Sequence, residues 1–448
     1  MLSVNDARRM AEDLVQGAIE AGADAADALY AGSHSSSVQV RLGELEQVQR
    51  SEGEEIGLRL FLGQRSATVA SSDLSRDALA ALVERALAMA AEALEDPFAG
   101  LAPRELLALG KLPPIDFGDG NEPDPAALRA RALAAEQAAR AIPGVTNSNG
   151  GSASASSSTV ALATSGGFAG AYAASGHSGS AGVVAGEGAG MQRDHAWHSA
   201  RHLADLEDAA AIGRRAGERA VARLGSARPK PARMPVLFDP RVSSSLLGHL
   251  AGAISGSAVA RKSSFLQDKL GERLFARGVT IVDDPLRPRG LRSRPFDGEG
   301  VRVARRELIA DGVLTSWIAE SAAARQLGIA PTGHAGRGTS GAPGASPSNF
   351  YMAAGARSRD ELLAAFPEAV LVTELIGMGV NGVTGDYSRG AAGFMVRDGA
   401  IAEPVSEMTI ASNLLEMFAT LEPGSDLELR HGVDAPTLLV PDMTVAAA

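Results

Sequence analysis

The stretch Ala369–Asn413, AVLVTELIGMGVNGVTGDYSRGAAGFMVRDGAIAEPVSEMTIASN, decides the fold class of the C-terminal part of the chain. It begins with an apolar, β-branched run and then holds six glycines within the seventeen residues 377–393. Two further extended runs follow, separated by Asp398-Gly399. Short apolar runs broken by turn residues, without a helical period, predict strands joined by loops. Glycine at this density indicates positive φ angles or a close backbone approach, so we expect a functional surface here.

The glycine pattern Gly377-Met-Gly379-Val-Asn-Gly382 is similar to a dinucleotide-binding fingerprint. That fingerprint needs a helix directly after it, because the pyrophosphate binds at the helix N-terminus. The residues that follow, VTGDYSRG over 383–390, are unsuited to open a helix. A glycine-rich loop between two strands is therefore the favoured interpretation.

Composition excludes several classes of protein. The 448 residues suggest two or three domains, and a net charge of -11 argues against a general affinity for nucleic acid. No apolar run reaches the length of about 18 residues that a membrane span needs, and no signal segment follows the first charges. With no cysteine there is no disulfide framework, thiolate nucleophile or thiolate metal ligand. We expect a cytoplasmic protein.

The first part of the chain predicts a small α+β domain over 1–96. Helical periodicity covers Asp6–Gly22 and Ser75–Leu94. Between them lie alternating runs, the clearest of which is Ile56–Leu62. Helices on both sides of strands are typical of a layered α/β arrangement.

A middle domain is predicted over 97–228. It contains an alanine-rich helix at Ala126–Ala141 and an amphipathic helix at Leu206–Leu224, on which Arg214, Arg215 and Arg219 are expected to be exposed. The Ser-, Ala- and Gly-rich stretch Val145–Gly190 has the composition of a flexible linker, but its alternation predicts antiparallel strands with small side chains.

Three histidines of this region, His195, His198 and His202, have spacings that would place them on one face of a helix, where they could bind a metal. Alternation from Met191 onward instead predicts a strand, which would put His195 and His198 on opposite faces. Surface or partly packed histidines are the favoured interpretation.

The third domain is predicted over 229–448, after a basic segment with two prolines that neither a helix nor a central strand accommodates. A helix is expected at Pro240–Gly256, a strand at Val301–Ile309 and a hairpin turn at Asp311-Gly312. The overall fold class is α+β: N-terminal α/β layers followed by a β-rich, barrel-like domain with peripheral helices.

Six segments of the third domain have a distinctive sequence: Leu247–Gly256 (LGHLAGAISG), Ala260–Leu266 (ARKSSFL), Arg294–Val301 (RPFDGEGV), Pro331–Gly336 (PTGHAG), Thr384–Phe394 (TGDYSRGAAGF) and Pro404–Ile410 (PVSEMTI). In these segments the third domain resembles the TldD/PmbA family, on its PmbA (TldE) branch, and the first two domains match it in order and length.

The resemblance implies a position beside a zinc peptidase. In the TldD paralogue the corresponding helix carries a His-Glu-x-x-x-His pattern, with two histidines on the metal, a glutamate as base and a downstream cysteine as a further ligand. Here His249 matches the first histidine, whereas Leu250 and Ile254 occupy the other two positions. One imidazole does not suffice for a catalytic zinc, which takes about three protein ligands. We therefore expect no catalytic residue and no metal in this chain, with zinc in a TldD-like partner.

The resemblance also implies a cytoplasmic heterodimer that cleaves or trims unfolded peptides, including the leader of a modified peptide antibiotic and an antitoxin. The candidate substrate-binding or interface residues lie in the glycine-rich loop and near it, where an extended peptide could bind by main-chain hydrogen bonds. They are His334, Gly377, Gly379, Asp386, Tyr387, Ser388 and Arg389. The alternative is that these side chains only satisfy the loop's own backbone.

Two other functions stay open at this stage. One is a stand-alone peptide-binding homodimer. The other is an independent hydrolase that uses a serine, although the chain has no Gly-x-Ser-x-Gly motif.

Overall fold

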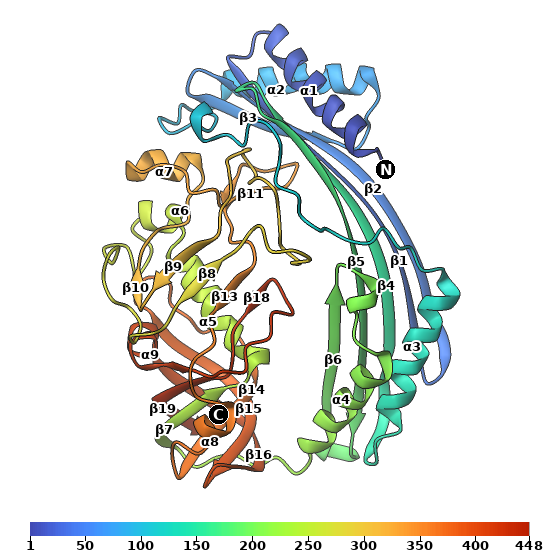
Figure 1. Ribbon diagram of the computed structural model, residues 1–448, viewed down its shortest axis with the longest axis vertical. Helices are drawn as coiled ribbons and strands as arrows, with labels where there is room; N and C mark the ends of the chain where they lie inside the picture. The colour runs from blue at the N-terminus through green and yellow to red at the C-terminus, as the bar shows by residue number, and fades with distance from the viewer. Residues whose placement is uncertain (448) are drawn as a thin grey trace.

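The structure is a computed structural model that describes residues 1–447. Figure 1 shows a long, curved N-terminal sheet on one side and a more rounded C-terminal domain on the other. None of the helices within residues 1–447 is long and apolar enough to cross a membrane.

The N-terminal sheet has six antiparallel strands in the order β3-β2-β1-β4-β5-β6. The strands are β1 (Ala25–Arg41), β2 (Glu44–Leu62), β3 (Arg65–Ser71), β4 (Val145–Thr164), β5 (Ala169–Ala185) and β6 (Gln192–Ala200). Strands β1 and β4 pair from Asp27↔Thr164 to Val40↔Gly151. The predicted segments 1–96 and 97–228 therefore contribute to one continuous sheet, and their division into two domains stays a prediction.

Small side chains fill the centre of this sheet. The stretch Val145–Gly190 forms β4 and β5, which confirms the predicted strands, and the linker interpretation was wrong. Serine hydroxyls bond across the two strands at 2.8 Å, in the pairs Ser152–Ser180 and Ser154–Ser178. Cross-strand hydroxyl pairs of this kind stabilise a sheet that few large apolar side chains support.

Four helices pack against the two ends of the sheet (Figure 1). They are α1 (Val4–Glu20), α2 (Arg76–Glu92), α3 (Pro125–Arg140) and α4 (Ala209–Ala222). The first two bury an alanine- and leucine-rich core against β1 and β2. Helices α3 and α4 approach closely because Gly213 and Gly217 face the α3 backbone, where a Cβ atom would collide with carbonyl oxygens.

The C-terminal domain is built on a closed five-stranded barrel, as predicted. Its strands follow the order β16-β15-β14-β7-β19, and pairing of β16 with β19 closes it. They are β7 (Ala232–Phe238), β14 (Glu368–Ile376), β15 (Asp386–Arg397), β16 (Ala400–Asn413) and β19 (Leu438–Ala447), with β17 (Glu422–Pro423) paired to β19. A large apolar core joins the barrel to the elements beside it.

A second five-stranded sheet lies beside the barrel, in the order β10-β9-β8-β13-β18. Its strands are β8 (Ile281–Asp283), β9 (Arg306–Ala310), β10 (Val313–Leu314), β13 (Phe350–Met352) and β18 (Val433–Asp434), and a small hairpin joins β11 (Ala335–Gly336) to β12 (Gly344–Ala345). The helices are α5 (Pro240–Ala253), α6 (Gly256–Ala260), α7 (Ser321–Leu327), α8 (Arg359–Leu363) and α9 (Leu414–Thr420).

The strand predicted over Val301–Ile309 was too long, since β9 begins only at Arg306. The reason is a turn just before it. Asp297 accepts hydrogen bonds from the backbone amides of Glu299 and Val301, both at 2.9 Å, and this holds the chain out of the sheet.

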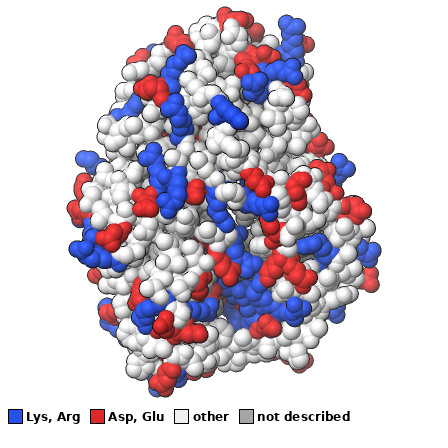
Figure 2. Space-filling view, in the orientation of Figure 1, with Lys and Arg blue, Asp and Glu red and all other residues white. Residues whose placement is uncertain are grey.

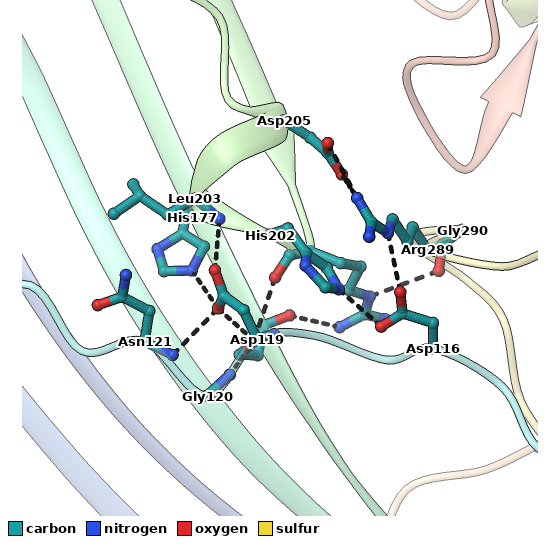
Figure 3. A network of polar contacts seen from close by, with 12 residues as sticks. Asp116, Asp119, Gly120, Asn121, His177, His202, Leu203, Asp205, Arg289 and Gly290 are labelled. Carbon is teal, nitrogen blue, oxygen red and sulfur yellow. Dashed lines mark hydrogen bonds and ion pairs between the residues drawn. The ribbon is translucent and has the colours of Figure 1, made fainter.

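Several groups of polar contacts join the halves of the molecule. One is buried and contains Asp27, Arg59, Glu299 and Arg337. Another surrounds the segment 116–121, where Figure 3 shows Asp116 close to His202 and Asp119 close to His177. There Arg289 of the C-terminal domain contacts Asp116 and Asp205 at 2.8 and 2.9 Å.

Candidate functional site

Helix α5 carries His249, which matches the first histidine of the metal-binding pattern. Asp239 caps its N-terminus by accepting the amide of Arg241 at 3.1 Å, and Pro240 occupies its first turn. A buried stripe of leucines then holds the helix on the barrel. His249 lies near its C-terminal end, half-buried, with its ring centroid 6.0 Å from that of Tyr387 in an edge-to-face arrangement.

The residues around His249 do not fit a catalytic zinc. Leu250 and Ile254 are fully buried in the apolar core, so neither position offers a donor. Across residues 1–447, no three or more His, Cys, Asp or Glu side chains are grouped so that they could hold a metal. Burial and the positive charge of Arg389 lower the pKa of His249. A neighbouring guanidinium also repels a metal cation.

The glycine-rich loop doubles back over the start of β15. Gly377 has a φ of 76°, and Ser388 donates its amide to the carbonyl of Gly379 at 2.7 Å. A Cβ atom on Gly379 would collide with the Ser388 carbonyl. The close backbone approach is therefore confirmed, and β15 follows the loop directly, as the strand-to-strand interpretation requires.

The polar residues of this loop and of the start of β15 have different surroundings. Asp386 accepts from Thr384 Oγ1 at 2.6 Å and from Asn413 Nδ2 at 3.2 Å, and these bonds lower its pKa. Asp386 thus stabilises the loop itself. Tyr387 points into the core, and burial raises its pKa. Arg389 donates to the carbonyl of Ile376 at 3.4 Å, while Ser388 is exposed.

The structure brings His249, Tyr387 and Arg389 together, whereas the polar contacts of His334 lie elsewhere. His334 is buried, with Nδ1 2.8 Å from Thr332 Oγ1 and Nε2 3.4 Å from Asp283 Oδ2. Its contacts are those of a packed histidine beside the β11–β12 hairpin. The assignment of His334 and of the loop residues to substrate or partner stays a prediction.

The three histidines of the middle segment do not share a helix face. Strand β6 ends at Ala200, with His195 exposed and His198 partly buried on the opposite face, as predicted. His202 lies beyond the strand, where Nε2 is 2.6 Å from Asp116 Oδ1 (Figure 3). On the neighbouring strand, His177 Nε2 is 3.1 Å from Asp119 Oδ1. These contacts fasten the segment 116–121 to the sheet.

A large polar cavity was missed by the sequence analysis. Its volume is about 1120 Å³, and it lies between β6 and α4 on one side and α5, β14 and the segment 426–435 on the other. Figure 2 shows a hollow between the two halves with Lys and Arg side chains inside it. The arginines that line the cavity are Arg193, Arg215, Arg219, Arg223, Arg241, Arg292, Arg359 and Arg430.

The only signal in the sequence was the arginine-rich face of the helix at Leu206–Leu224. The helical pattern predicts that Arg214, Arg215 and Arg219 are all exposed. Of these three, only Arg214 is exposed in the structure, because Arg215 and Arg219 are partly buried where α4 meets the C-terminal domain. The other arginines of the cavity come from segments that only the folded chain brings together.

The chain matches three family profiles in succession. They are the PmbA/TldA metallopeptidase domain 1 over residues 26–90, the central domain over 118–224 and the C-terminal domain over 231–447. The chain is 37% identical to the metalloprotease PmbA of Escherichia coli O157:H7, covering 98% of this chain and 96% of that protein. It is 34% identical to a metalloprotease PmbA homologue of Haemophilus influenzae, covering 96% and 94%.

Solved structures share the whole fold. A Bacteroides thetaiotaomicron protein, named for a proposed role in modulating DNA gyrase, superimposes with a TM-score of 0.92 at 25% identity, and both chains are covered completely. TldE from Thermococcus kodakarensis superimposes with a TM-score of 0.88 at 20% identity, covering 98% of this chain and all of that one. From the three consecutive domains and the full-length sequence relatives, we conclude that this chain belongs to the PmbA/TldD family of metallopeptidases.

Proposed function

We propose that this chain is the non-catalytic subunit of a TldD/TldE-type zinc metallopeptidase heterodimer that degrades or trims unfolded peptides. Within that pair the TldD-like subunit supplies the zinc and the general base. The pair works in the cytoplasm, and its substrates include leader segments of modified peptides and antitoxins.

One observation carries this proposal. The helix that would hold a hydrolytic metal has a single imidazole, His249, and places Leu250 and Ile254 in the apolar core. Hydrolysis of a peptide by a metal-bound water needs about three protein ligands and an open position on the metal. A family member without the donors has a role in the assembly that does not require its own metal.

The surface around this helix supports a role in binding. The glycine-rich loop exposes apolar side chains, among them Met378, which is 89% exposed, together with Ile376 and Val383. Exposed apolar side chains that are grouped on one loop are typical of a surface that a partner or a peptide covers. Gly377, Gly379, Asp386, Ser388 and Arg389 shape this loop and the strand that follows it.

The proposal is tested by mixing the purified chain with an unfolded peptide, with and without a purified TldD-like subunit. We expect cleavage only with both subunits, zinc only in the TldD-like subunit, and a mixed dimer by light scattering. Cleavage by this chain alone, abolished by a chelator, would contradict the proposal.

The alternative function, a stand-alone peptide-binding homodimer, gives a different result in the same experiment. The chain would then have the mass of a dimer by itself and would not associate with the TldD-like subunit.

A further inference from the structure

The arginine-lined cavity between the two halves is unusual for a chain with a net charge of -11. A second, smaller hollow of about 340 Å³ continues it and shares Ser199, Leu291, Arg430 and His431 with it. The cations are all arginines, whose planar guanidinium groups suit carboxylates and phosphates because they donate two parallel hydrogen bonds.

The acidic side chains that line the cavity are already engaged. Asp194 pairs with Arg241 at 2.6 Å, Asp239 pairs with Arg359 at 3.0 Å, and Glu374 pairs with Arg223. Of the other three, Glu428 pairs with Arg430, Asp426 accepts from Thr437, and Asp434 accepts the amides of Arg430 and His431. The wall holds eight arginines against these six carboxylates, which leaves an excess of positive charge.

Three arginines of the cavity have no carboxylate within ion-pair distance among residues 1–447. They are Arg193 on β6, Arg219 on α4 and Arg292 in the loop after Gly290. Arg219 is partly buried, and its one hydrogen bond within the described residues runs from Nη1 to the carbonyl of His195 at 3.4 Å. Burial, together with the charge of Arg241, lowers the pKa of Arg219 to about 10. A cation in such a place is stabilised by an added anion.

We propose that this cavity binds an acidic segment of a peptide, with carboxylates of the peptide pairing with Arg219, Arg193 and Arg292. The inference rests on the proposed function in peptide handling and adds a preference for acidic substrates. The cavity also offers apolar surface, because Trp197 is 44% exposed and lies against His431 with ring centroids 4.4 Å apart.

The shape of the site favours a peptide over a phosphate group. The three free guanidinium groups come from three separate segments around a volume of about 1120 Å³, which exceeds a typical small-ligand pocket. Two helices begin at the wall: α8, which starts at Arg359, is capped by Ser358, and the N-terminus of α5 is already occupied by the carboxylate of Asp239. That negative charge repels a phosphate at the position where a helix would otherwise bind one.

The test uses the full chain and two fluorescein-labelled peptides. One is a short, unstructured Gly/Ser peptide that carries several glutamates, and the other has glutamine at each of those positions. Fluorescence anisotropy at low and physiological salt gives the affinity of each peptide. We expect the chain to bind the acidic peptide more tightly, with an affinity that falls as salt rises.

The variant Arg219→Gln should weaken binding of the acidic peptide about tenfold, because it removes charge-assisted hydrogen bonds. Arg214→Gln is the matched control: Arg214 lies on the same helix but is exposed and outside the cavity, so binding should not change. If Arg219→Gln does not fold, as circular dichroism will show, the double variant Arg193→Gln/Arg292→Gln replaces two exposed residues and should weaken binding likewise.

Equal binding of the two peptides would overturn the inference, as would equal losses in Arg214→Gln and Arg219→Gln. Displacement of the acidic peptide by micromolar inorganic phosphate would assign the cavity to phosphate and also overturn it. The proposed acidic-peptide site and the proposed function can be rejected independently of each other. Cleavage by the mixed pair without acidic preference rejects this inference alone, whereas acidic-peptide binding without cleavage by the pair rejects the proposed function alone.

Discussion

Asp27 and Arg337, which lie 310 residues apart in the chain, form a fully buried ion pair between the N-terminal sheet and the C-terminal domain. Arg59 completes the group from the neighbouring strand, with its Nε 3.0 Å from the second carboxylate oxygen of Asp27. Glu299, also buried, lies 3.6 Å from Arg59, so two carboxylates face the two buried guanidinium groups. Nearby charges oppose the cost of burial and lower the pKa of Asp27.

Replacing Asp27 with alanine should destabilise the fold strongly, because it leaves Arg337 buried without its carboxylate partner and Arg59 with only Glu299. We expect a loss of about 3–5 kcal/mol in the free energy of unfolding, measured with urea. The control is Asp442→Ala, which breaks the exposed pair with Arg233 and should cost less than about 1 kcal/mol. Similar losses in the two variants would show that burial of the Asp27 pair is unimportant.

The stability of the protein should fall as the pH rises through the range in which Asp297 titrates. Burial and the nearby charge of Glu299 raise the pKa of Asp297 to about 7, although three backbone amides oppose the shift. The folded chain thus holds a proton that the unfolded chain releases at a lower pH, so this group's contribution is present in acid and is lost toward pH 7.

This dependence is measured as the free energy of unfolding between pH 4 and pH 8, where the slope from one group is at most about 1.4 kcal/mol per pH unit. Asp297→Asn should flatten the slope. Asp398→Asn, at an exposed turn position, should leave it unchanged. An unaltered slope in Asp297→Asn would mean that another group causes the dependence.

Adding a methyl group at Gly379 should disrupt the glycine-rich loop, since the new Cβ would collide with the Ser388 carbonyl. We expect Gly379→Ala to destabilise the protein by about 1–3 kcal/mol and to speed proteolysis within residues 376–388. Gly382→Ala is the matched control, because the nearest atom to its Cβ would be 3.9 Å away. Equal protease sensitivity of the two variants would argue against the close approach.

Metal content should be independent of His249. The purified chain and its His249→Ala variant should both contain zinc well below one atom per chain by mass spectrometry, and a chelator should leave their melting temperatures unchanged. The physical reason is the donor set: His249 offers one imidazole, and the two corresponding positions after it, Leu250 and Ile254, are apolar and buried. Stoichiometric zinc that disappears in His249→Ala would refute this prediction.

Helices and strands that depend on the local pattern of apolar and polar residues were predicted from the sequence. Helix α3 was expected at Ala126–Ala141 and spans Pro125–Arg140, and the alternation in Val145–Gly190 correctly indicated β4 and β5. Strand length was harder to predict. Strand β1 was expected as two separate runs, Asp27–Ala31 and Ser37–Leu42, because Gly32 and the serines in its centre have low β-propensity, but pairing on both sides holds it as one strand.

The contacts between distant segments could not be predicted. The pair of Asp27 with Arg337 has no signal in local spacing, and of the cavity only the arginines of α4 had one, because the other partners come from distant segments. The vacant metal positions Leu250 and Ile254 were recognised only through the family resemblance. Their burial then supplied a physical reason for the missing ligands.

The pairing of β1 with β4 has a consequence for how this protein is made. Strand β1 leaves the ribosome well before β4, and everything from Leu42 to Gly144 must be synthesised in between. During that interval one side of β1 presents unpaired backbone groups to the cell, a state that invites wrong association. The nascent chain should therefore depend on molecular chaperones until β4 arrives.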